Sequence, residues 1–187
     1  MSSPVLVPIL ETPRLRLRGH RLVDFPQSSA MWADPAVVRY IRPTPFNEEE
    51  TWARMLRHVG HWALLGYGYW MVEDKETSQF LGEAGFADFH RVTEPLGVVH
   101  MPEAGWAFRA EVHGRGYASE TVAAIVAWGD SHFDGSTCCI IDPQNAASIR
   151  VAEKNGYSAK QVIKYRSEEV MMYERERLGT IPVDPNP

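Results

Sequence analysis

Two glycines one residue apart, Gly114 and Gly116, precede a segment with the apolar spacing of a helix. Glycine lets the backbone approach a ligand closely, and the free N–H groups and dipole at a helix start favour an anion. The segment 113–119 (HGRGYAS) therefore predicts a loop that binds the pyrophosphate of a nucleotide cofactor, with a charged contact from Arg115. The alternative is a glycine turn that only redirects the chain.

Two known phosphate-binding loops differ from this segment. A P-loop needs Gly-Lys-Ser/Thr, whereas Gly116 is followed by Tyr117 and Ala118. A dinucleotide-binding loop needs a third glycine where Ser119 stands, and a parallel sheet around it. Asp142 lies near the position of the acid that binds the ribose, but the strands before the loop have the pattern of antiparallel hairpins. A Rossmann-type nucleotide binder therefore ranks below other nucleotide folds.

Histidine and cysteine positions predict neither a metal site nor a disulfide. His58 and His61 lie three residues apart on an expected helix, but no third ligand accompanies them. Cys138 and Cys139 are adjacent in an apolar strand, so their side chains should point to opposite faces and be buried separately. We expect no metal.

Composition predicts one globular domain. The chain has 187 residues, 44% hydrophobic and 23% charged, with a net charge of -5 and no basic stripe of the kind that binds nucleic acid. No signal peptide or apolar run near 20 residues stands out, so we expect a cytoplasmic protein that engages neither membrane nor nucleic acid. The domain should span residues 1–178, followed by an unstructured tail, 179–187, that contains three prolines.

The elements expected before the loop are a strand, helices and antiparallel strands. Leu15 and Leu17 alternate with arginines in a first strand, and Asn47 with Glu50 resembles a capping box that starts a helix. That helix should bury a stripe made of Trp52, Leu56, Val59 and Ala63. Further helix and strand signals cover residues 22–32, ending at Asp34-Pro35, and then 69–72, 80–89 and 103–109.

The strand 103–109 leads into the loop and alternates cleanly. Ala104, Trp106 and Phe108 should share one face, with Glu103 on the other. The expected later elements are a helix over 118–133, a strand over 137–141, a helix from Asn145 to Gly156 and a hairpin over 157–165 and 169–175. This order predicts an α/β or α+β domain with a mixed sheet.

The loop resembles the Arg/Gln-x-x-Gly-x-Gly/Ala motif of the GCN5-related N-acetyltransferase (GNAT) superfamily, with His113 in place of the usual Arg or Gln. Two other blocks add to the resemblance and occur in the family's order. Residues 11–18 (ETPRLRLR) are similar to the opening strand of the RimJ/RimL-like ribosomal-protein branch. Residues 145–157 are similar to that branch's Asn-x-x-Ser…Glu-Lys-x-Gly-Phe helix.

The resemblance implies a single GNAT-type domain with a mixed, mostly antiparallel central sheet, splayed between its fourth and fifth strands and flanked by helices. Acetyl-CoA would lie in the splay, and no metal is used. The residues implied to bind it are Trp106, Ala107 and Phe108 through their backbone, the loop residues His113, Gly114, Arg115, Gly116, Tyr117, Ala118 and Ser119, and then Asn145 and Ser148 near the sulfur. Asn145 serves equally well as a plain helix cap.

The implied reaction is direct attack of a primary amine on the thioester. Glu103 and Glu83 are the candidate bases, although Glu83 also suits a salt bridge. Relatives often carry a tyrosine acid where Ala152 stands, so Ser148 is the candidate that hydrogen-bonds the departing sulfur, or the thiolate leaves unaided. Tyr157 should pack in the core.

The acceptor is left open by the sequence. A protein N-terminus or a small-molecule amine both fit, and a binding module that holds CoA or acyl-CoA without turnover is the alternative to an enzyme. The aromatic residues Trp62, Tyr67, Tyr69 and Trp70 suit either a core or an acceptor wall. A monomer or a homodimer is expected.

Overall fold

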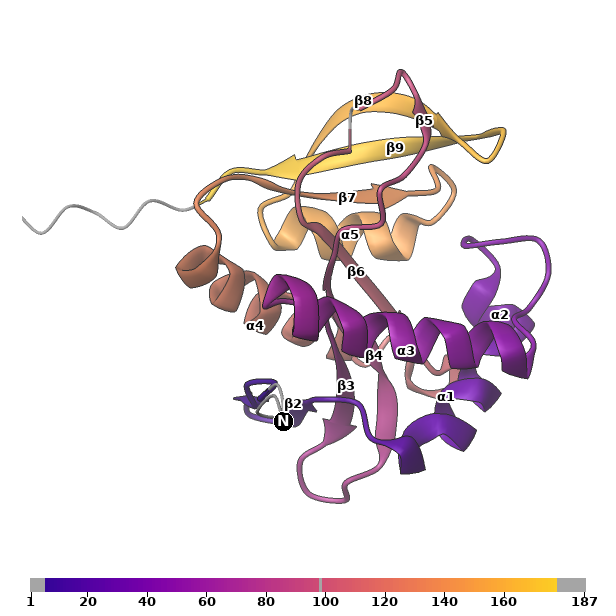
Figure 1. Cartoon of the computed structure of the whole chain (residues 1–187), viewed down its shortest axis with the longest axis vertical. Helices are drawn as coiled ribbons and strands as arrows, with labels where there is room; N and C mark the ends of the chain where they lie inside the picture. Colours follow the sequence, from indigo (N-terminus) through magenta and orange to yellow (C-terminus); the bar gives the residue numbers. More distant parts are fainter. Residues whose placement is uncertain (1–5, 98, 178–187) are drawn as a thin grey trace, which may run out of the picture.

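A computed structural model describes residues 6–97 and 99–177 of the chain. One sheet of nine strands runs through it in the order β1-β2-β3-β4-β6-β7-β9-β8-β5, and only β6 and β7 pair in parallel (Figure 1). The strands are β1 (Leu10–Glu11), β2 (Leu15–Arg18), β3 (Tyr69–Asp74), β4 (Phe80–Ala87), β5 (Thr93–Glu94), β6 (Glu103–Phe108), β7 (Thr137–Ile141), β8 (Ser158–Tyr165) and β9 (Glu168–Arg175). The expected mixed, mostly antiparallel sheet is confirmed.

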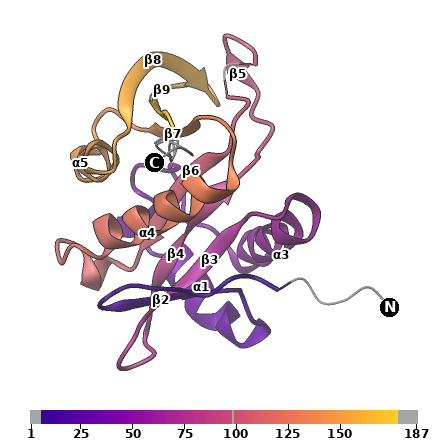
Figure 2. The ribbon, with the colours of Figure 1, turned by 90° about the vertical axis from the view of Figure 1, so that its left-hand side faces the viewer.

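Helices cover both faces of this sheet. They are α1 (Phe25–Trp32), α2 (Pro35–Val38), α3 (Glu48–Leu65), α4 (Tyr117–His132) and α5 (Ala146–Lys154), with two 3₁₀ turns, η1 (Leu22–Asp24) and η2 (Ala110–Val112). Figure 2 shows α3 and α4 on opposite sides of β3 and β4. No helix within residues 6–97 and 99–177 is both long enough and apolar enough to cross a membrane.

The sheet is splayed between β6 and β7, as expected. Glu103 and Cys138 are the register partners of these two strands, and the Cys138 N–H donates to the carbonyl of Pro102 at 3.1 Å. Beyond this point the strands diverge, whereas β6 pairs with β4 along its full length, from Glu103 to Phe108. The open edge of β6 therefore faces a gap that ends at Glu103.

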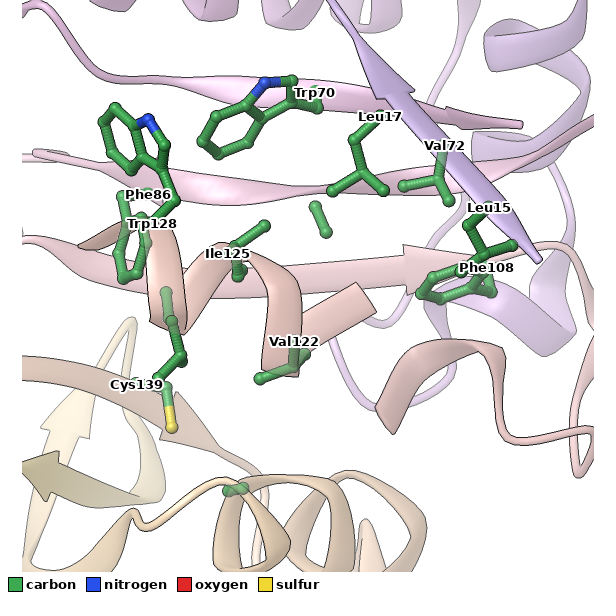
Figure 3. Packing of buried hydrophobic residues seen from close by; sticks show 14 of the residues in the cluster. Leu15, Leu17, Trp70, Val72, Phe86, Phe108, Val122, Ile125, Trp128 and Cys139 are labelled. Carbon is green, nitrogen blue, oxygen red and sulfur yellow. The ribbon is translucent and has the colours of Figure 1, made fainter. Parts of the chain in front are cut away.

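The main core lies between the sheet and α4 (Figure 3). In this core, Leu15 and Leu17 of β2 and Trp70 of β3 pack with Ile125 and Trp128 of α4. All of them except Trp128 are fully buried. The alternation expected for β6 holds, because Ala104 and Phe108 belong to this core whereas Ala107 packs against α1 on the other side. Burial of these side chains removes large apolar areas from water and fixes α4 on the sheet.

The N-terminus of α3 is confirmed, but its expected buried stripe is wrong. Asn47 accepts from the Glu50 N–H at 2.8 Å and Glu50 accepts from the Asn47 N–H at 3.0 Å, which is the expected capping box. The stripe expected to be buried, Trp52, Leu56, Val59 and Ala63, is exposed. The side chains buried instead are Thr51, Met55, His58, His61 and Trp62. The buried face is shifted by one residue because histidines, which can be buried when neutral, occupy it.

Two smaller elements differ from expectation. The helix expected over 22–32 ends before Asp34-Pro35, as predicted, but Asp34 then accepts from the Ala36 N–H at 2.8 Å and caps a further short helix, α2, that was not expected. The short strand β5 adds to the free edge of β8 and lacks a clear sequence pattern. Cys138 and Cys139 are both buried and free, in separate clusters on opposite faces of β7, as expected. The tail 179–187 lies outside the described residues.

Candidate functional site

The glycine loop joins the end of β6 to the start of α4. Gly114 and Gly116 have φ values of 76° and 80°, in the left-handed region that glycine adopts without strain, and Gly116 is the N-cap of α4. A Cβ at position 114 would meet nothing within 4 Å, and one at position 116 would approach only the Arg14 guanidinium, at 3.5 Å. The surface beside both glycines is therefore open to a ligand.

The backbone amides of this loop are free. The His113 N–H donates to Ala110 and the Glu120 N–H donates to Gly116, but the N–H groups of residues 114–119 between them donate to no atom of the described chain. Free N–H groups at the start of a 16-residue helix, together with its dipole, favour an anion. The loop thus has the donor arrangement that the sequence predicts for a pyrophosphate site.

His113 holds the loop against β6. Its Nε2 lies 2.9 Å from the carbonyl oxygen of Phe108, so this nitrogen carries the proton and donates. The residue that departs from the family motif therefore closes the turn between strand and helix with a hydrogen bond. This role does not depend on an arginine or glutamine at position 113.

The N-terminal block fixes the other side of the loop. Thr12 donates to a carboxylate oxygen of Glu120 at 2.6 Å, and the Arg14 guanidinium donates to the second oxygen at 2.7 Å and to the Arg115 carbonyl at 3.0 Å. The Arg14 guanidinium also lies over the ring of Tyr117, 4.6 Å from its centroid. The negative charge of Glu120 in the first turn of α4 is thereby paired, and the Arg14 guanidinium lies beside the free amides.

The open edge of β6 supplies further backbone groups. The Arg109 N–H donates to Leu81 on β4, so the alternation along the strand turns the N–H groups of Phe108 and Trp106 toward the gap. Ala107 has the opposite orientation and pairs its backbone with β4. Of the three expected residues, Trp106 and Phe108 thus present backbone polar groups to the gap, with the Phe108 carbonyl already bound by His113.

Helix α5 begins close to β7, at the other side of the gap. Asn145 caps it by accepting from the Ser148 N–H at 3.1 Å, so its carbonyl oxygen is engaged, and Ser148 is half-buried. Ala152 is fully buried in the main core. Tyr157 is also buried there and shares a 2.8 Å hydrogen bond with Thr137, and burial raises its pKa well above the ordinary value. Tyr157 therefore packs in the core as expected.

Glu103 lies on the face of β6 opposite α4, at the closed end of the gap. It is 4% exposed, and both carboxylate oxygens accept hydrogen bonds from Arg91, one of them at 2.7 Å. Tyr69 comes from β3 and crosses the sheet on the same face, because its neighbours Gly85 on β4 and Gly105 on β6 lack side chains. A Cβ at Gly105 would overlap the Tyr69 hydroxyl.

Burial raises the pKa of Tyr69 well above its ordinary value. Its hydroxyl therefore stays protonated and can donate a hydrogen bond beside β6. Tyr69, Glu103 and Arg91 thus lie together at the end of the gap where Glu103 and Cys138 meet.

Glu83, the second candidate base, lies in a closed environment. It is 1% exposed and accepts from Ser28 and, at 3.1 Å, from Trp32, both on α1, while Arg54 lies 3.8 Å away. These contacts hold α1 to the sheet. The salt-bridge interpretation of Glu83 fits the structure, and its oxygens do not face the gap.

The two histidines that lie three residues apart on α3, His58 and His61, make packing contacts. Among residues 6–97 and 99–177, no group of three or more His, Cys, Asp or Glu side chains is arranged to hold a metal ion. His58 is instead stacked on Tyr69 with ring centroids 4.2 Å apart, and His61 donates from Nε2 to the Asp88 carbonyl at 2.9 Å. Both histidines pack α3 against the sheet.

Three residues at the site, Arg14, Tyr69 and Arg91, were not predicted from the sequence. Arg14 lay within a recognised block, but nothing in that block indicates a contact with a helix a hundred residues later. Tyr69 was noted only as one of several aromatics, and Arg91 lies in a segment without a motif. A glycine at each of positions 85 and 105, opposite an aromatic residue, is the one signal that could have indicated the path of Tyr69 across the sheet.

Comparisons with known proteins agree on one family. Residues 14–158 match the family model described as acetyltransferase (GNAT) domain. The protein YkkB of Bacillus subtilis, of uncharacterised function, is 36% identical over 114 residues, a match that covers 59% of this chain and 63% of the relative. An uncharacterised N-acetyltransferase, p20 of Bacillus licheniformis, is 25% identical over 83% of this chain and 85% of its own.

Solved structures share the fold over most of the chain. An acetyltransferase from Agrobacterium tumefaciens is 26% identical with a TM-score of 0.78, covering 90% of this chain and 94% of its own. A GnaT-family acetyltransferase from Bordetella pertussis has the same identity and a TM-score of 0.76, covering 90% and 99%. RimL, solved in complex with coenzyme A, is 15% identical with a TM-score of 0.73, covering 90% and 98%, and so shows likeness of fold alone.

Proposed function

The chain belongs to the GNAT acetyltransferase family, and from this premise we propose that it transfers the acetyl group of acetyl-CoA to a primary amine by direct attack. The observation that carries the proposal is the run of free amides at residues 114–119, next to the open edge of β6. Any helix start leaves its first N–H groups unpaired, but here no side chain of the described chain caps them and the N–H groups of residues 114 and 115 extend the run.

The residues present fit acetyl-CoA as cosubstrate. The amides of residues 114–119 would hold the pyrophosphate, with positive charge from Arg115 and from Arg14 beside Gly116. The backbone of Trp106 and the N–H of Phe108 would pair with the pantetheine arm at the open edge of β6, and Asn145 and Ser148 would lie near the sulfur. Bound in this way, acetyl-CoA supplies an activated acyl group at the end of the gap marked by Glu103.

The chain's own groups would then manage protons and charge. A neutral amine forms the N–C bond, the C–S bond breaks, and one proton must leave the amine while the sulfur departs as a thiolate or thiol. Glu103 is the proposed base, acting through water because Arg91 engages both carboxylate oxygens. A backbone N–H of β6 would stabilise the oxyanion, and Ser148 would hydrogen-bond the sulfur, because Ala152 is buried and offers no acid.

We extend the proposal to the RimJ/RimL-like branch, whose acceptors are protein N-termini. Support comes from the two blocks that carried the resemblance. Thr12 and Arg14 of the first block clamp Glu120 beside the loop, and Asn145 and Ser148 of the second begin α5 at the gap. Both blocks therefore contribute to the same site.

Binding of acetyl-CoA tests the role of the glycine loop directly. Gly116→Asp places a side chain on a left-handed backbone and a negative charge among the free amides. The Kd for acetyl-CoA should therefore rise by about 100-fold or more, as expected from the cost of an unpaired charge. Titration calorimetry with acetyl-CoA measures this. Gly135→Asp, whose Cβ would meet nothing within 4 Å and which lies beyond α4, should bind as the wild type does. Unchanged affinity in folded Gly116→Asp protein would show that the glycine loop does not bind the pyrophosphate.

Turnover tests the base. With an amine panel monitored by thiol release, Glu103→Gln should lower kcat by about 100-fold or more while the KM for acetyl-CoA changes little. Glu76→Gln, an exposed residue of the turn between β3 and β4, serves as the control. A Glu103→Gln rate equal to wild type from pH 6 to 9 rules Glu103 out. Tight CoA binding without thiol release from any amine would favour a binding module instead.

A further inference from the structure

Building on the proposed transfer to an amine, we propose that the acceptor carries a carboxylate close to its amine and that Arg57 binds this carboxylate. The residues that argue for it form an acceptor-side cluster on the face of the sheet opposite α4. The acceptor-side cluster consists of Arg54, Arg57, Tyr69, Phe89, Arg91 and Glu103.

The face of β6 that carries this cluster is fixed by the core. Ala107 packs with Met31 and Trp32 of α1, and Glu103 and Gly105 share its side of the strand by alternation. The glycine loop opens α4, which packs on the other face. An acceptor that meets the acetyl group at the gap from the side opposite the loop would therefore contact the acceptor-side cluster.

The guanidinium groups of the cluster are unequally paired. Arg91 is bound by Glu103, and Arg54 lies 3.8 Å from Glu83 with its guanidinium over the ring of Trp32. Arg57 has no carboxylate within 4.0 Å in the part of the chain that the structure describes. Three cations thus share two carboxylates, and the cation left over is Arg57, the one member of the three that is exposed.

The surroundings of Arg57 favour an anion. Desolvation by the surrounding protein and the neighbouring charges of Arg54 and Arg91 lower the pKa of Arg57, although an arginine stays protonated at neutral pH. Its guanidinium lies over the ring of Phe89, 5.2 Å from the centroid, which holds the group in place while leaving its N–H groups free. A carboxylate there would gain charge-assisted hydrogen bonds and relieve the repulsion among the three cations.

Two aromatic rings, Phe89 and Tyr69, lie between Arg57 and the strand β6, where the acetyl group would be held. Phe89, beneath Arg57, lies 6.4 Å between centroids from Tyr69, and the Tyr69 hydroxyl reaches the backbone of Gly105. An amine at Gly105 and an anion at Arg57 therefore belong to one compact molecule or to the first residues of one peptide. The same cations disfavour polyamines and polycationic antibiotics, even though the whole chain has a net charge of -5.

One chemistry, an amine with a nearby carboxylate, has two sources here. A free amino acid offers its α-carboxylate, and a peptide offers the side chain of an acidic residue beside its N-terminus. Matched pairs separate them: amino acids against their carboxamides, and tetrapeptides with Glu against Gln at the second position. Spermidine provides an acceptor without a carboxylate.

The experiment measures kcat/KM for these pairs by thiol release, in the wild type, Arg57→Gln and Arg57→Lys. In one of the two kinds of matched pair, the wild type should have the higher kcat/KM for the member with the carboxylate. Arg57→Gln should reduce this ratio of kcat/KM values by about 10- to 100-fold, as expected for hydrogen bonds to a charged group. Arg57→Lys should keep part of it. Arg21→Gln should keep all of it, because Arg21 lies just after β2, three strands from β6, and its exposed guanidinium pairs with no carboxylate of the described chain.

A binding measurement makes the inference independent of turnover. In the presence of CoA, the preferred carboxylate acceptor should raise the Tm of the wild type more than its uncharged partner does, and Arg57→Gln should remove this difference. Binding without any thiol release would retain the carboxylate site and reject the transferase. Equal use of both members of every pair, a preference for spermidine, or a preference that survives in Arg57→Gln would overturn the inference while leaving the transferase in place.

Discussion

At the scale of single residues, Gly105 and Tyr69 determine the shape of the sheet face on which we propose that the acceptor binds. Tyr69 runs across β4 and β6 on the face opposite α4, and it does so because glycines occupy positions 85 and 105. Its hydroxyl is thereby held over the strand that would bind the acetyl group. The space for this ring is a property of backbone positions rather than of any polar side chain.

Gly105→Ala should disturb both stability and activity. The new Cβ would overlap the buried Tyr69 hydroxyl and force the ring to move, so we expect a loss of about 1–3 kcal/mol in unfolding free energy, and lower kcat. Urea denaturation and thiol release measure the two effects. Gly60→Ala in α3, where a Cβ meets nothing within 4 Å, should instead add about 0.5–1 kcal/mol. A Gly105→Ala protein as stable and active as the wild type would contradict this account.

Residues with a strong local signal were the ones that sequence predicted well. The capping box of Asn47 and Glu50 and the glycine loop that opens the helix after Gly116 follow from local backbone chemistry, and both are present. Arg91, by contrast, contributes through its pairing with Glu103 twelve residues away, across a loop with no regular pattern. Pairings of this kind depend on tertiary structure and leave no periodic trace in the sequence.

At the scale of elements, α3 shows why an amphipathic pattern can be assigned to the wrong face. The helix carries apolar residues on two adjacent stripes, and the exposed stripe includes Trp52, whose ring meets Phe25 edge-on at 5.2 Å. The buried stripe includes His58, stacked between Tyr69 and His20. Hydrophobicity counts treat histidine as polar, so they favoured the wrong stripe by one residue.

The histidines beneath α3 should make stability depend on pH. Both ring nitrogens of His20 and of His58 are buried without a partner in the described chain, and burial, the largest cause, lowers the pKa of each, well below the ordinary value for His58. Arg54 and Arg57 further lower the pKa of His58, while Glu83 and Asp24 partly offset the shift for His20. The unfolded chain then binds protons near pH 6.5 that the folded chain does not.

Stability should therefore be complete above about pH 6.5 and fall as the pH drops below it, by up to about 1.4 kcal/mol per pH unit for each histidine. Urea denaturation at pH 5.5, 6.0, 6.5 and 7.5 gives the slope. His58→Phe, which keeps a ring against Tyr69, should have a shallower slope than the wild type. Parallel slopes for wild type and His58→Phe would exclude the effect.

At the scale of the whole molecule, sequence predicted the order of elements and the splay, because both follow from the family resemblance and from periodicity. The carboxylate preference that we propose for the acceptor did not follow from the sequence, since it depends on which of three arginines lacks a carboxylate partner in the described chain. Net charge, the whole-chain quantity that the sequence offers, has the opposite sign to this local cluster. The proposed acceptor class thus rests on local pairing rather than on composition.

The single register pair between β6 and β7 has a consequence for how the molecule holds together. Apart from β5, the strands on one side of the gap come from residues 10–108 and those on the other from residues 137–175, so backbone hydrogen bonding nearly stops where the chain's two halves meet. A cosubstrate that pairs with the open edge of β6 while contacting α5 would bridge these halves. Its binding would then add backbone contacts between halves that otherwise meet mainly through the side chains of the main core, and would strengthen the coupling of their unfolding.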